Sequence, residues 1–285
     1  MTAPVIFQKI EWMQQFSRQQ RDAGKRIAFV PTMGYLHEGH LHLVQQACER
    51  AECVVVSIFV NPIQFGPHED LDRYPQDLDG DLQKLSAYPV DVVFYPTVAD
   101  MYPNGFQTRV HVERISSGLC GASRPGHFDG VATVVLKLLH IVEPDIAVFG
   151  LKDYQQFQVI KTMVRDLNMT LQLVGVPTVR EADGLAMSSR NVYLLPEQRT
   201  AAVVLNRSLE QAEQAIRNGH LITGEEVEAF LREAIEAEPL ARLDYAACRD
   251  ASTLEPVGRI DTDVVLALAV FFGTTRLIDN RVIHV

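Results

Sequence analysis

The first half of the chain alternates short apolar runs with amphipathic segments. The runs are rich in Val, Ile and Phe, and several are bounded by Gly, Asn or Pro, a pattern typical of strands buried on both faces. Strands of this kind separated by helices predict a parallel sheet with right-handed crossovers, an α/β fold. We expect strands at Ile27–Thr32, Cys53–Val60, Asp91–Tyr95, Asp145–Phe149 and Leu171–Val176, and helices at His40–Arg50, Gln76–Ala87, Gly130–Val142 and Tyr154–Leu167.

The pattern changes after about residue 176. Two amphipathic segments come first and three strand-like runs follow them, so no strand–helix alternation remains. This order predicts a smaller α+β domain with an antiparallel sheet. We therefore expect two domains, residues 1–177 and 178–285. In the second we expect helices at Pro196–Asn218 and Gly224–Ala237 and strands at Arg242–Arg249, Val264–Phe272 and Thr275–Val285.

Composition and charge narrow the classes of partner and compartment. The net charge of −10 argues against a broad basic face for nucleic acid, but it allows a local basic pocket. The longest apolar runs are far shorter than the roughly 20 residues that a membrane-spanning helix needs. Met1–Gln8 lacks the basic and apolar regions of a secretory signal. The four cysteines form no CxxC pair, so we expect reduced thiols in a cytoplasmic protein.

Ligands of parallel sheets bind beyond the carboxyl ends of the strands, so the residues that follow each strand are the candidates for chemistry. The first strand continues into PTMGYLHEGH. Gly34 and Gly39 allow close backbone approach, and a helix starting here presents N–H groups to an anion. His37 and His40 are three residues apart and would share a helical face, from which both can donate hydrogen bonds to phosphate. A solvated histidine pair is the plain alternative; zinc is disfavoured because His42 would face elsewhere.

Two further segments carry polar groups in the first domain. Asn61 and Gln64 follow the second strand, and their amides suit the hydroxyl and carboxylate groups of a small substrate, although taken alone the feature is better explained by a turn-forming Asn before Pro. The sequence GLCGASRPGHFDG contains Arg124 and His127 between glycines. We interpret it either as a flexible, anion-facing loop or as an ordinary surface loop.

Two later segments supply positive charge and hydroxyl groups. The fourth strand ends in FGLKDYQQ, where Lys152 can place a charge on a phosphate, Asp153 suits a helix cap, and Gln156 would face the same crevice. The segment MSSRN offers Ser188, Ser189 and Arg190, which together can hold a polyphosphate, although taken alone a Ser-Ser-Arg segment is more often ordinary surface.

Taken together, these segments resemble the pantothenate synthetase (pantoate–β-alanine ligase) family of the HIGH-type nucleotidyltransferase superfamily. The resemblance covers essentially the whole chain. Its motifs appear in family order: PTMGYLHEGH, FVNPIQF, ASRPGHFDGV, FGLKDYQQ and GLAMSSRN. The resemblance implies a Rossmann-like catalytic domain that binds ATP and pantoate, followed by a smaller lid domain, in a homodimer formed through the larger domain.

The resemblance also implies a two-step ligation. Pantoate attacks the α-phosphate of ATP to give pantoyl adenylate and pyrophosphate, and β-alanine then attacks the adenylate to give pantothenate and AMP. Mg²⁺ accompanies the ATP phosphates, with no separate protein metal site. Pantothenate synthesis places such an enzyme in the route to coenzyme A.

Residue roles follow from the same resemblance. The groups implied as catalytic are His37, His40, Lys152, Ser188, Ser189 and Arg190. The implied ATP-binding residues are Met33, Gly34, Tyr35, Leu36, His37, Glu38, Gly39, His40, Gly150, Leu151, Lys152, Asp153, Val179, Met187, Ser188, Ser189 and Arg190. The implied substrate-binding residues are Gln64, Gln156 and Asn61, with Gln64 also facing β-alanine.

Two alternatives remain at this point. Another adenylyl or cytidylyl transferase of the superfamily would use the HxGH and SSR segments equally well, although FVNPIQF and Gln156 argue against it. A non-catalytic nucleotide-binding protein predicts ATP binding without turnover.

Overall fold

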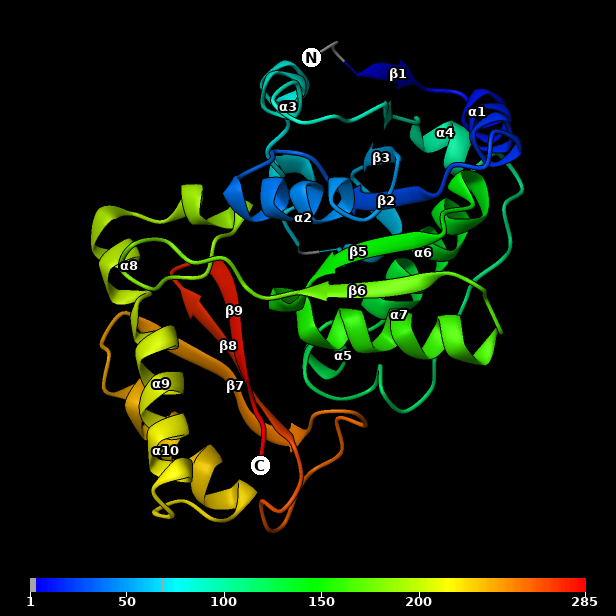
Figure 1. Cartoon of the computed structure of the whole chain (residues 1–285). Helices are drawn as coiled ribbons and strands as arrows, with labels where there is room; N and C mark the ends of the chain where they lie inside the picture. Colours follow the sequence, from blue (N-terminus) through cyan, green and yellow to red (C-terminus); the bar gives the residue numbers. More distant parts are fainter. Residues whose placement is uncertain (1–3, 68) are drawn as a thin grey trace. The chain divides into compact units, whose positions relative to one another are not determined.

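The computed structural model describes residues 4–67 and 69–285 and divides the chain into two compact units (Figure 1). The first unit comprises residues 1–113, 124–151 and 159–177. The second comprises residues 114–123, 152–158 and 178–285. The second unit therefore includes two short segments that precede residue 178, where we had placed the domain boundary. The division of the chain into a catalytic domain and a lid domain remains a prediction.

A six-stranded parallel sheet forms the centre of the first unit. Its strand order is β1-β4-β3-β2-β5-β6. This confirms the predicted Rossmann-like fold class, in which successive strands are joined by helical crossovers. The strands are β1 (Val5–Phe7), β2 (Ile27–Thr32), β3 (Cys53–Ile58), β4 (Val92–Phe94), β5 (Ile146–Gly150) and β6 (Gln172–Val176).

Helices cover the sheet, and alternate residues of each strand point to opposite faces. Ala28 and Val30 of β2 pack with Leu41 and Val44 of helix α2 in one buried cluster. Helices α1 and α6 contact β2 and each other. The helices and 3-10 turns before residue 178 are α1 (Ile10–Asp22), α2 (Glu38–Cys48), η1 (Pro62–Gln64), η2 (Leu71–Arg73), α3 (Leu78–Leu85), α4 (Val98–Met101), α5 (Cys120–Ser123), α6 (His127–Val142), η3 (Leu151–Asp153) and α7 (Tyr154–Asp166).

Several element ends differ from the sequence-based expectation. Strand β3 ends at Ile58 rather than Val60, since Asn61-Pro62 follows and proline disfavours continued pairing. Helix α6 begins at His127, directly after Gly126 in a left-handed conformation, so most of the expected loop 118–130 is helical or turned. The sequence analysis missed β1 and α1, because β1 is only three residues long and α1 buries only Met13 and Ser17.

The second unit contains an antiparallel sheet in the order β7-β8-β9, as predicted for an α+β domain. The expected single helix 196–218 is interrupted at Ala202 and Val203, where hydrogen bonds tighten to 3-10 spacing. The elements of the second unit after residue 178 are η4 (Ser189–Tyr193), α8 (Pro196–Ala201), α9 (Val204–Arg217), α10 (Gly224–Glu236), β7 (Ala241–Asp250), β8 (Val264–Phe272) and β9 (Thr275–Ile283).

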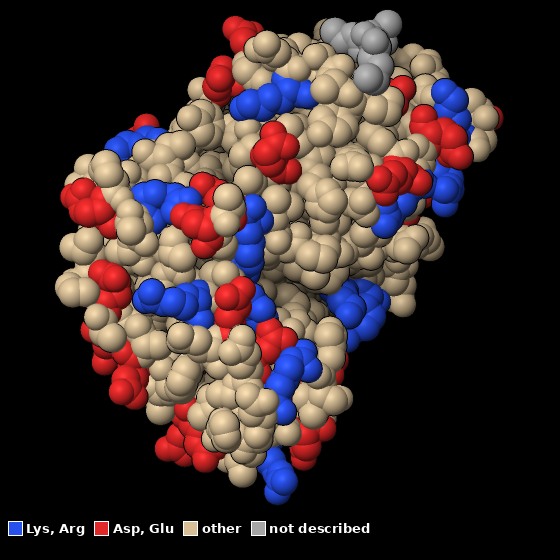
Figure 2. Space-filling view, turned by 60° about the vertical axis from the view of Figure 1, so that its left-hand side comes forward, with Lys and Arg blue, Asp and Glu red and all other residues tan. Residues whose placement is uncertain are grey.

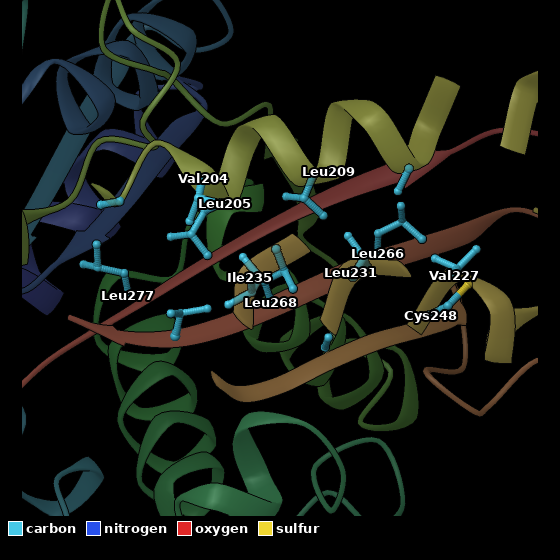
Figure 3. Packing of buried hydrophobic residues seen from close by; sticks show 14 of the residues in the cluster. Val204, Leu205, Leu209, Val227, Leu231, Ile235, Cys248, Leu266, Leu268 and Leu277 are labelled. Atoms are coloured by element: carbon cyan, nitrogen blue, oxygen red, sulfur yellow. The ribbon is translucent and has the colours of Figure 1, made fainter. Parts of the chain in front are cut away.

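The core of the second unit lies between this sheet and helices α9 and α10 (Figure 3). Leu205 and Leu209 of α9 and Leu231 of α10 pack against Leu266 and Leu268 of β8, and all five are at most 1% exposed. Helical spacing on α9 and strand alternation on β8 supply this common apolar face.

The surface carries both signs of charge. On the face shown in Figure 2, basic and acidic side chains are interspersed. Over the whole sequence, acidic residues outnumber basic ones and the net charge is −10. Within the described residues, no helix combines the length and the apolar character needed to cross a bilayer.

Candidate active site

The change of direction in the sheet marks the place where the first unit gathers its candidate residues. Strands β2 and β5 are neighbours, while the chain proceeds from β2 through β3 to β4 on one side and from β5 to β6 on the other. Ligands of open parallel sheets bind outside the carboxyl ends at such a switch point. The segment Met33–His40 follows β2, and Gly150 ends β5, so the sheet brings these two predicted regions to the same edge.

The loop between β2 and α2 has an uncommon backbone. Gly34 has φ 82° and Tyr35 has φ 52°, both in the left-handed region. A Cβ on Gly34 would lie 2.9 Å from Ile58 Cγ2, so the position also demands glycine for space. The Asp81 carboxylate accepts hydrogen bonds from Tyr35 N at 2.8 Å and from Leu36 N at 2.6 Å. This tight turn directs the chain into α2 at His37.

The two histidines of the motif lie together at the N-terminus of α2. His37 is the N-cap residue rather than a helical one, and the ring centroids of His37 and His40 are 4.1 Å apart. Nδ1 of His37 accepts from Gly39 N at 3.2 Å, and Nδ1 of His40 faces His37 N at 3.4 Å. Because each Nδ1 faces an N–H donor, the proton of each neutral ring is carried by Nε2, which is then a hydrogen-bond donor.

The amide of Gln64 is held by a buried network in the first unit. Asn61 is 1% exposed, and its Nδ2 donates to Gln64 Oε1 at 3.0 Å and to Gly130 O at 3.1 Å. Tyr102 donates its hydroxyl proton to Asn61 Oδ1 at 2.7 Å. Both amide hydrogens of Asn61 are therefore used within the protein, so its geometry favours support of Gln64 over donation to a substrate.

The orientation of Gln64 follows from these bonds. Its Oε1 is the acceptor for Asn61, and its Nε2 contacts Met33 Sδ at 3.1 Å. Thioether sulfur is a weak acceptor, so the Gln64 amide keeps donor capacity for a stronger partner.

The segment that precedes α6 is structured by an ion pair rather than open to an anion. Arg124 donates through Nε to Glu69 Oε1 at 2.7 Å, and His127 Nδ1 lies 2.8 Å from Gln64 O. Burial alone would raise the pKa of Glu69, but the hydrogen bonds and charge of Arg124 outweigh it and lower that pKa. Of the two interpretations of this segment, an anion-facing loop or an ordinary surface loop, these contacts favour the second, with Arg124 fixing the segment next to Gln64.

A cavity of about 470 Å³ borders the motif loop on the side of β3 and β4. Its lining is mostly apolar and includes three aspartates. Only Met33, Gly34 and Tyr35 among the sequence-predicted site residues line it. The other lining residues are Ile58, Phe59, Val60, Pro62, Leu71, Asp72, Gln76, Asp77, Leu78, Asp81, Tyr95, Pro96, Thr97 and Val98.

Lys152 and Gln156 belong to the second unit, in η3 and the first turn of α7. Neither side chain has a hydrogen bond or ion pair to another described residue, so both keep their full capacity for a ligand. The backbone around Lys152 is fixed, since Asn280 Nδ2 donates to Lys152 O at 2.7 Å. The neighbouring Gln155 is 7% exposed and binds Cys120 N, Ile115 O and Gly118 O through its amide.

The segment that contains Ser188, Ser189 and Arg190 follows a tight hairpin in the second unit. Met187 N donates to Val179 O at 3.0 Å, and Gly184 at the turn has φ 93°, as the Asp-Gly pair indicates. Ser188 caps η4 by accepting from Arg190 N at 3.3 Å.

Ion pairs hold this hairpin in place. Arg180 binds Asp279 of β9 through two hydrogen bonds, at 2.7 and 3.0 Å. Asn191 donates to Glu181 Oε1 at 2.9 Å, and Arg199 pairs with Glu181 and Asp183. Val179 and Met187 are therefore fixed at the base of the hairpin that leads to the two serines.

Sequence reasoning missed several supporting residues. Of these, Asp81 could have been recognised from its position in the sequence. It occupies the third position after Leu78 on the apolar stripe of α3, where a carboxylate is out of place unless it has buried partners. Tyr102, Asp279 and Asn280 left no such signal, because their partners are far away in the sequence.

Comparison with known proteins assigns the chain to a family. The profile of the family described as pantoate-beta-alanine ligase matches residues 5–282. The pantothenate synthetase of Pelotomaculum thermopropionicum is 55% identical over 98% of this chain and 99% of its own length. That of Geobacter sulfurreducens is 55% identical over 98% of each chain.

Solved structures give the same assignment. Pantothenate synthetase from Thermus thermophilus has a TM-score of 0.91 and 45% identity, covering 97% of this chain and 98% of its own. The pantoate-beta-alanine ligase of Francisella tularensis, solved with beta-gamma ATP and beta-alanine, has a TM-score of 0.81 and 35% identity, covering 98% of this chain and 97% of its own. The chain is thus an enzyme that belongs to the pantoate–β-alanine ligase family.

Proposed function

We propose that this ligase condenses pantoate with β-alanine at the expense of ATP, through a pantoyl-adenylate intermediate, and so forms pantothenate for coenzyme A synthesis. The observation that carries the proposal is the histidine pair at the start of α2, with both Nδ1 atoms facing backbone donors. Two Nε2–H groups on one helix terminus at the switch point of the sheet suit phosphate oxygens. The family and the neighbour solved with ATP and β-alanine support the same substrates.

In the first step, a pantoate carboxylate oxygen bonds to the α-phosphorus of ATP, and the bond from that phosphorus to the bridging oxygen breaks. Pyrophosphate leaves with the electron pair. Hydrogen bonds from His37 and His40 stabilise the negative charge that builds up on the phosphate oxygens. His40 acts here as a donor of a hydrogen bond rather than a source of a proton, because pyrophosphate is a weak base.

In the second step, the β-alanine amine attacks the acyl carbon of the adenylate. A carbon–nitrogen bond forms, AMP leaves, and the amine loses a proton to solvent. The Gln64 amide, oriented by Asn61, is proposed to bind pantoate and to face β-alanine, and Gln156 is proposed to bind pantoate.

The remaining phosphate contacts are proposed from the second unit. Lys152 supplies a positive charge with no competing partner among the described residues, and Ser188, Ser189 and Arg190 bind the polyphosphate. Gly150, Leu151, Asp153, Val179 and Met187 are proposed to line the nucleotide. Mg²⁺ is proposed to bind through the ATP phosphates, since this ion keeps much of its coordination for water and nucleotide oxygens. It neutralises phosphate charge when bound.

The decisive experiment is exchange of labelled pyrophosphate into ATP with Mg²⁺ and pantoate present and β-alanine absent. Exchange that requires pantoate establishes adenylate formation and fixes the acid substrate. Release of AMP on adding β-alanine then identifies the amine. No exchange by a folded sample that binds ATP would contradict the proposal and favour another acceptor or a non-catalytic nucleotide-binding role.

We also propose a homodimer formed through the larger domain, on the basis of family membership. The surface at Phe106–Val112 is a candidate contact, because Phe106, Val110 and Val112 are only partly covered. Sedimentation equilibrium with the variant Val110→Asp tests it: a monomer is expected if this surface is the interface, and an unchanged dimer would place the interface elsewhere.

A further inference from the structure

We propose that Asp81 is a positioning residue for adenylate formation, which holds the backbone of Tyr35 and Leu36 so that His37 enters α2 with its ring in place. The inference rests on the proposed function, in which the imidazoles of His37 and His40 bind phosphate. Asp81 acts through the loop and touches no substrate itself.

The geometry of the carboxylate is bidentate. Oδ2 accepts from Tyr35 N at 2.8 Å and Oδ1 accepts from Leu36 N at 2.6 Å, so each oxygen serves one backbone donor. Asp81 is 1% exposed, which makes these bonds strong relative to those at a surface. Two consecutive N–H groups bound by one carboxylate fix the peptide plane between them.

The loop needs these hydrogen bonds because its backbone conformation is unfavourable by itself. Tyr35 has a left-handed backbone, which a non-glycine residue adopts only at a cost in free energy. Gly34, next to it, is also left-handed and packs against Ile58 and Asp81 Oδ2. Without Asp81 the segment would relax toward ordinary conformations, and the direction of the chain at His37 would change.

A second group from the same helix holds the other side of the loop. Lys84 is one helical turn after Asp81, and its Nζ donates to Leu36 O at 2.7 Å. Helix α3 therefore accepts from the N–H of Leu36 and donates to its carbonyl. The next residue is His37, so both restraints end directly before the N-cap of α2.

The proposal assigns a purpose to a charged residue on an apolar helix face. Leu78, Leu82 and Leu85 form that face together with Asp81. Burial is the main cause that raises the pKa of Asp81, while the two N–H donors and the charge of Lys84 act in the opposite direction. The charged carboxylate is therefore kept in this position at a cost in free energy. An apolar residue would suit the face better if packing were the only requirement.

The test compares Asp81→Asn with Asp79→Asn. The first change keeps size and shape but replaces one acceptor oxygen by an NH₂ group, which then faces a backbone N–H. The second removes the same charge from an exposed residue of the same helix. We expect Asp81→Asn to lower pantoate-dependent pyrophosphate exchange by about 10- to 100-fold, as for loss of a charge-assisted hydrogen bond, and Asp79→Asn to leave it unchanged.

A step-specific readout separates positioning from general destabilisation. Pantoyl adenylate supplied directly should react with β-alanine at the wild-type rate in Asp81→Asn, and the KM for pantoate should stay the same. The ¹⁵N imidazole signals of His37 and His40 should shift in Asp81→Asn and not in Asp79→Asn. If Asp81→Asn does not fold, Lys84→Met, at an exposed position, should lower exchange about 3- to 10-fold and shift the same signals.

Wild-type rates of exchange and unshifted histidine signals in Asp81→Asn would overturn the proposal, as would equal losses in both half-reactions. For Lys84→Met, a wild-type exchange rate with unshifted signals counts against it in the same way. A failure of the proposed function is recognised separately, because wild-type enzyme would then show no pantoate-dependent exchange, while the histidine signals would still report whether Asp81 positions the rings.

Discussion

At the scale of single residues, hydrogen bonds determine how the histidines of the PTMGYLHEGH segment can interact with a ligand. His37 and His40 are three residues apart, and their ring centroids lie 4.1 Å from each other with the ring planes tilted by 32°. A backbone N–H group faces Nδ1 of each ring, so a neutral ring carries its proton on Nε2. This geometry supports the proposal that the pair donates hydrogen bonds to phosphate.

We predict that His40→Ala lowers the rate of adenylate formation by about 10²-fold or more, because a donor aimed at developing phosphate charge is lost. Single-turnover formation of pantoyl adenylate measures the effect, and circular dichroism checks that the fold is intact. His42→Ala, on the same helix, is the matched control. An unchanged single-turnover rate in His40→Ala would falsify the role assigned to the pair.

Asn61 offers a second prediction of this kind. Asn61→Ala leaves the Tyr102 hydroxyl, Gly130 O and Gln64 Oε1 without their partner, so we expect a loss of about 1–3 kcal/mol in the free energy of unfolding and a higher KM for pantoate. Urea unfolding and steady-state kinetics measure the two effects.

Tyr102→Phe is the control, since it removes only the bond to Asn61 Oδ1 and leaves Gln64 held. A KM for pantoate that rises as much in Tyr102→Phe as in Asn61→Ala would mean that Asn61 does not act by orienting Gln64.

Between elements, close packing of a helix against a turn fixes the backbone at Gln64, which is proposed to bind pantoate. Gly130 in α6 lies against η1: a Cβ there would be 2.4 Å from Ile63 O and 2.6 Å from Gln64 Cα. The backbone atoms in contact cannot swing away as a flexible side chain can. Glycine at this position lets α6 support Gln64 directly.

Gly130→Ala should therefore lower the free energy of unfolding by about 1–3 kcal/mol and raise the KM for pantoate, because η1 must move. Thermal unfolding and kinetics measure these effects. Gly118→Ala, where a Cβ meets nothing within 4 Å, is the control and should be close to wild type. Wild-type stability and KM in Gly130→Ala would show that η1 tolerates displacement.

Across the molecule as a whole, each of the two units has its own sheet. The second unit has an independent hydrophobic core in which α9 and α10 cover the antiparallel sheet. Ser188, Ser189 and Arg190 of this unit are proposed to bind the polyphosphate, so binding of ATP and pantoate should restrict this segment and shelter the adenylate from water.

We expect trypsin to cleave after Arg190 more slowly when ATP and pantoate are both present than with pantoate alone. Mass spectrometry of the fragments measures the cleavage rate at this bond. Equal rates under the two conditions would exclude closure of this segment over the nucleotide.

The parallel sheet and the later antiparallel sheet could be predicted from the amino-acid order alone, and the segments proposed to carry chemistry were identified from it as well. These features depend on local periodicity and on motifs of adjacent residues, such as the two histidines three positions apart. Local patterns did not show that His37 is a cap, that Arg124 is engaged by Glu69, or that Asn61 is enclosed by Tyr102 and Gly130.

Those points became visible in the folded chain, because most of the partners lie tens of residues away and the bonds form when strands and helices pack. The same reason explains why the residues of the short motifs and the residues that hold them in place lie far apart in the sequence. Residues proposed to meet the substrate cluster in short motifs after strands, whereas Asp81, Asn280 and Asp279 hold them from distant elements. Local order specified which side chains are proposed to carry the chemistry, and long-range packing specified where each one is held.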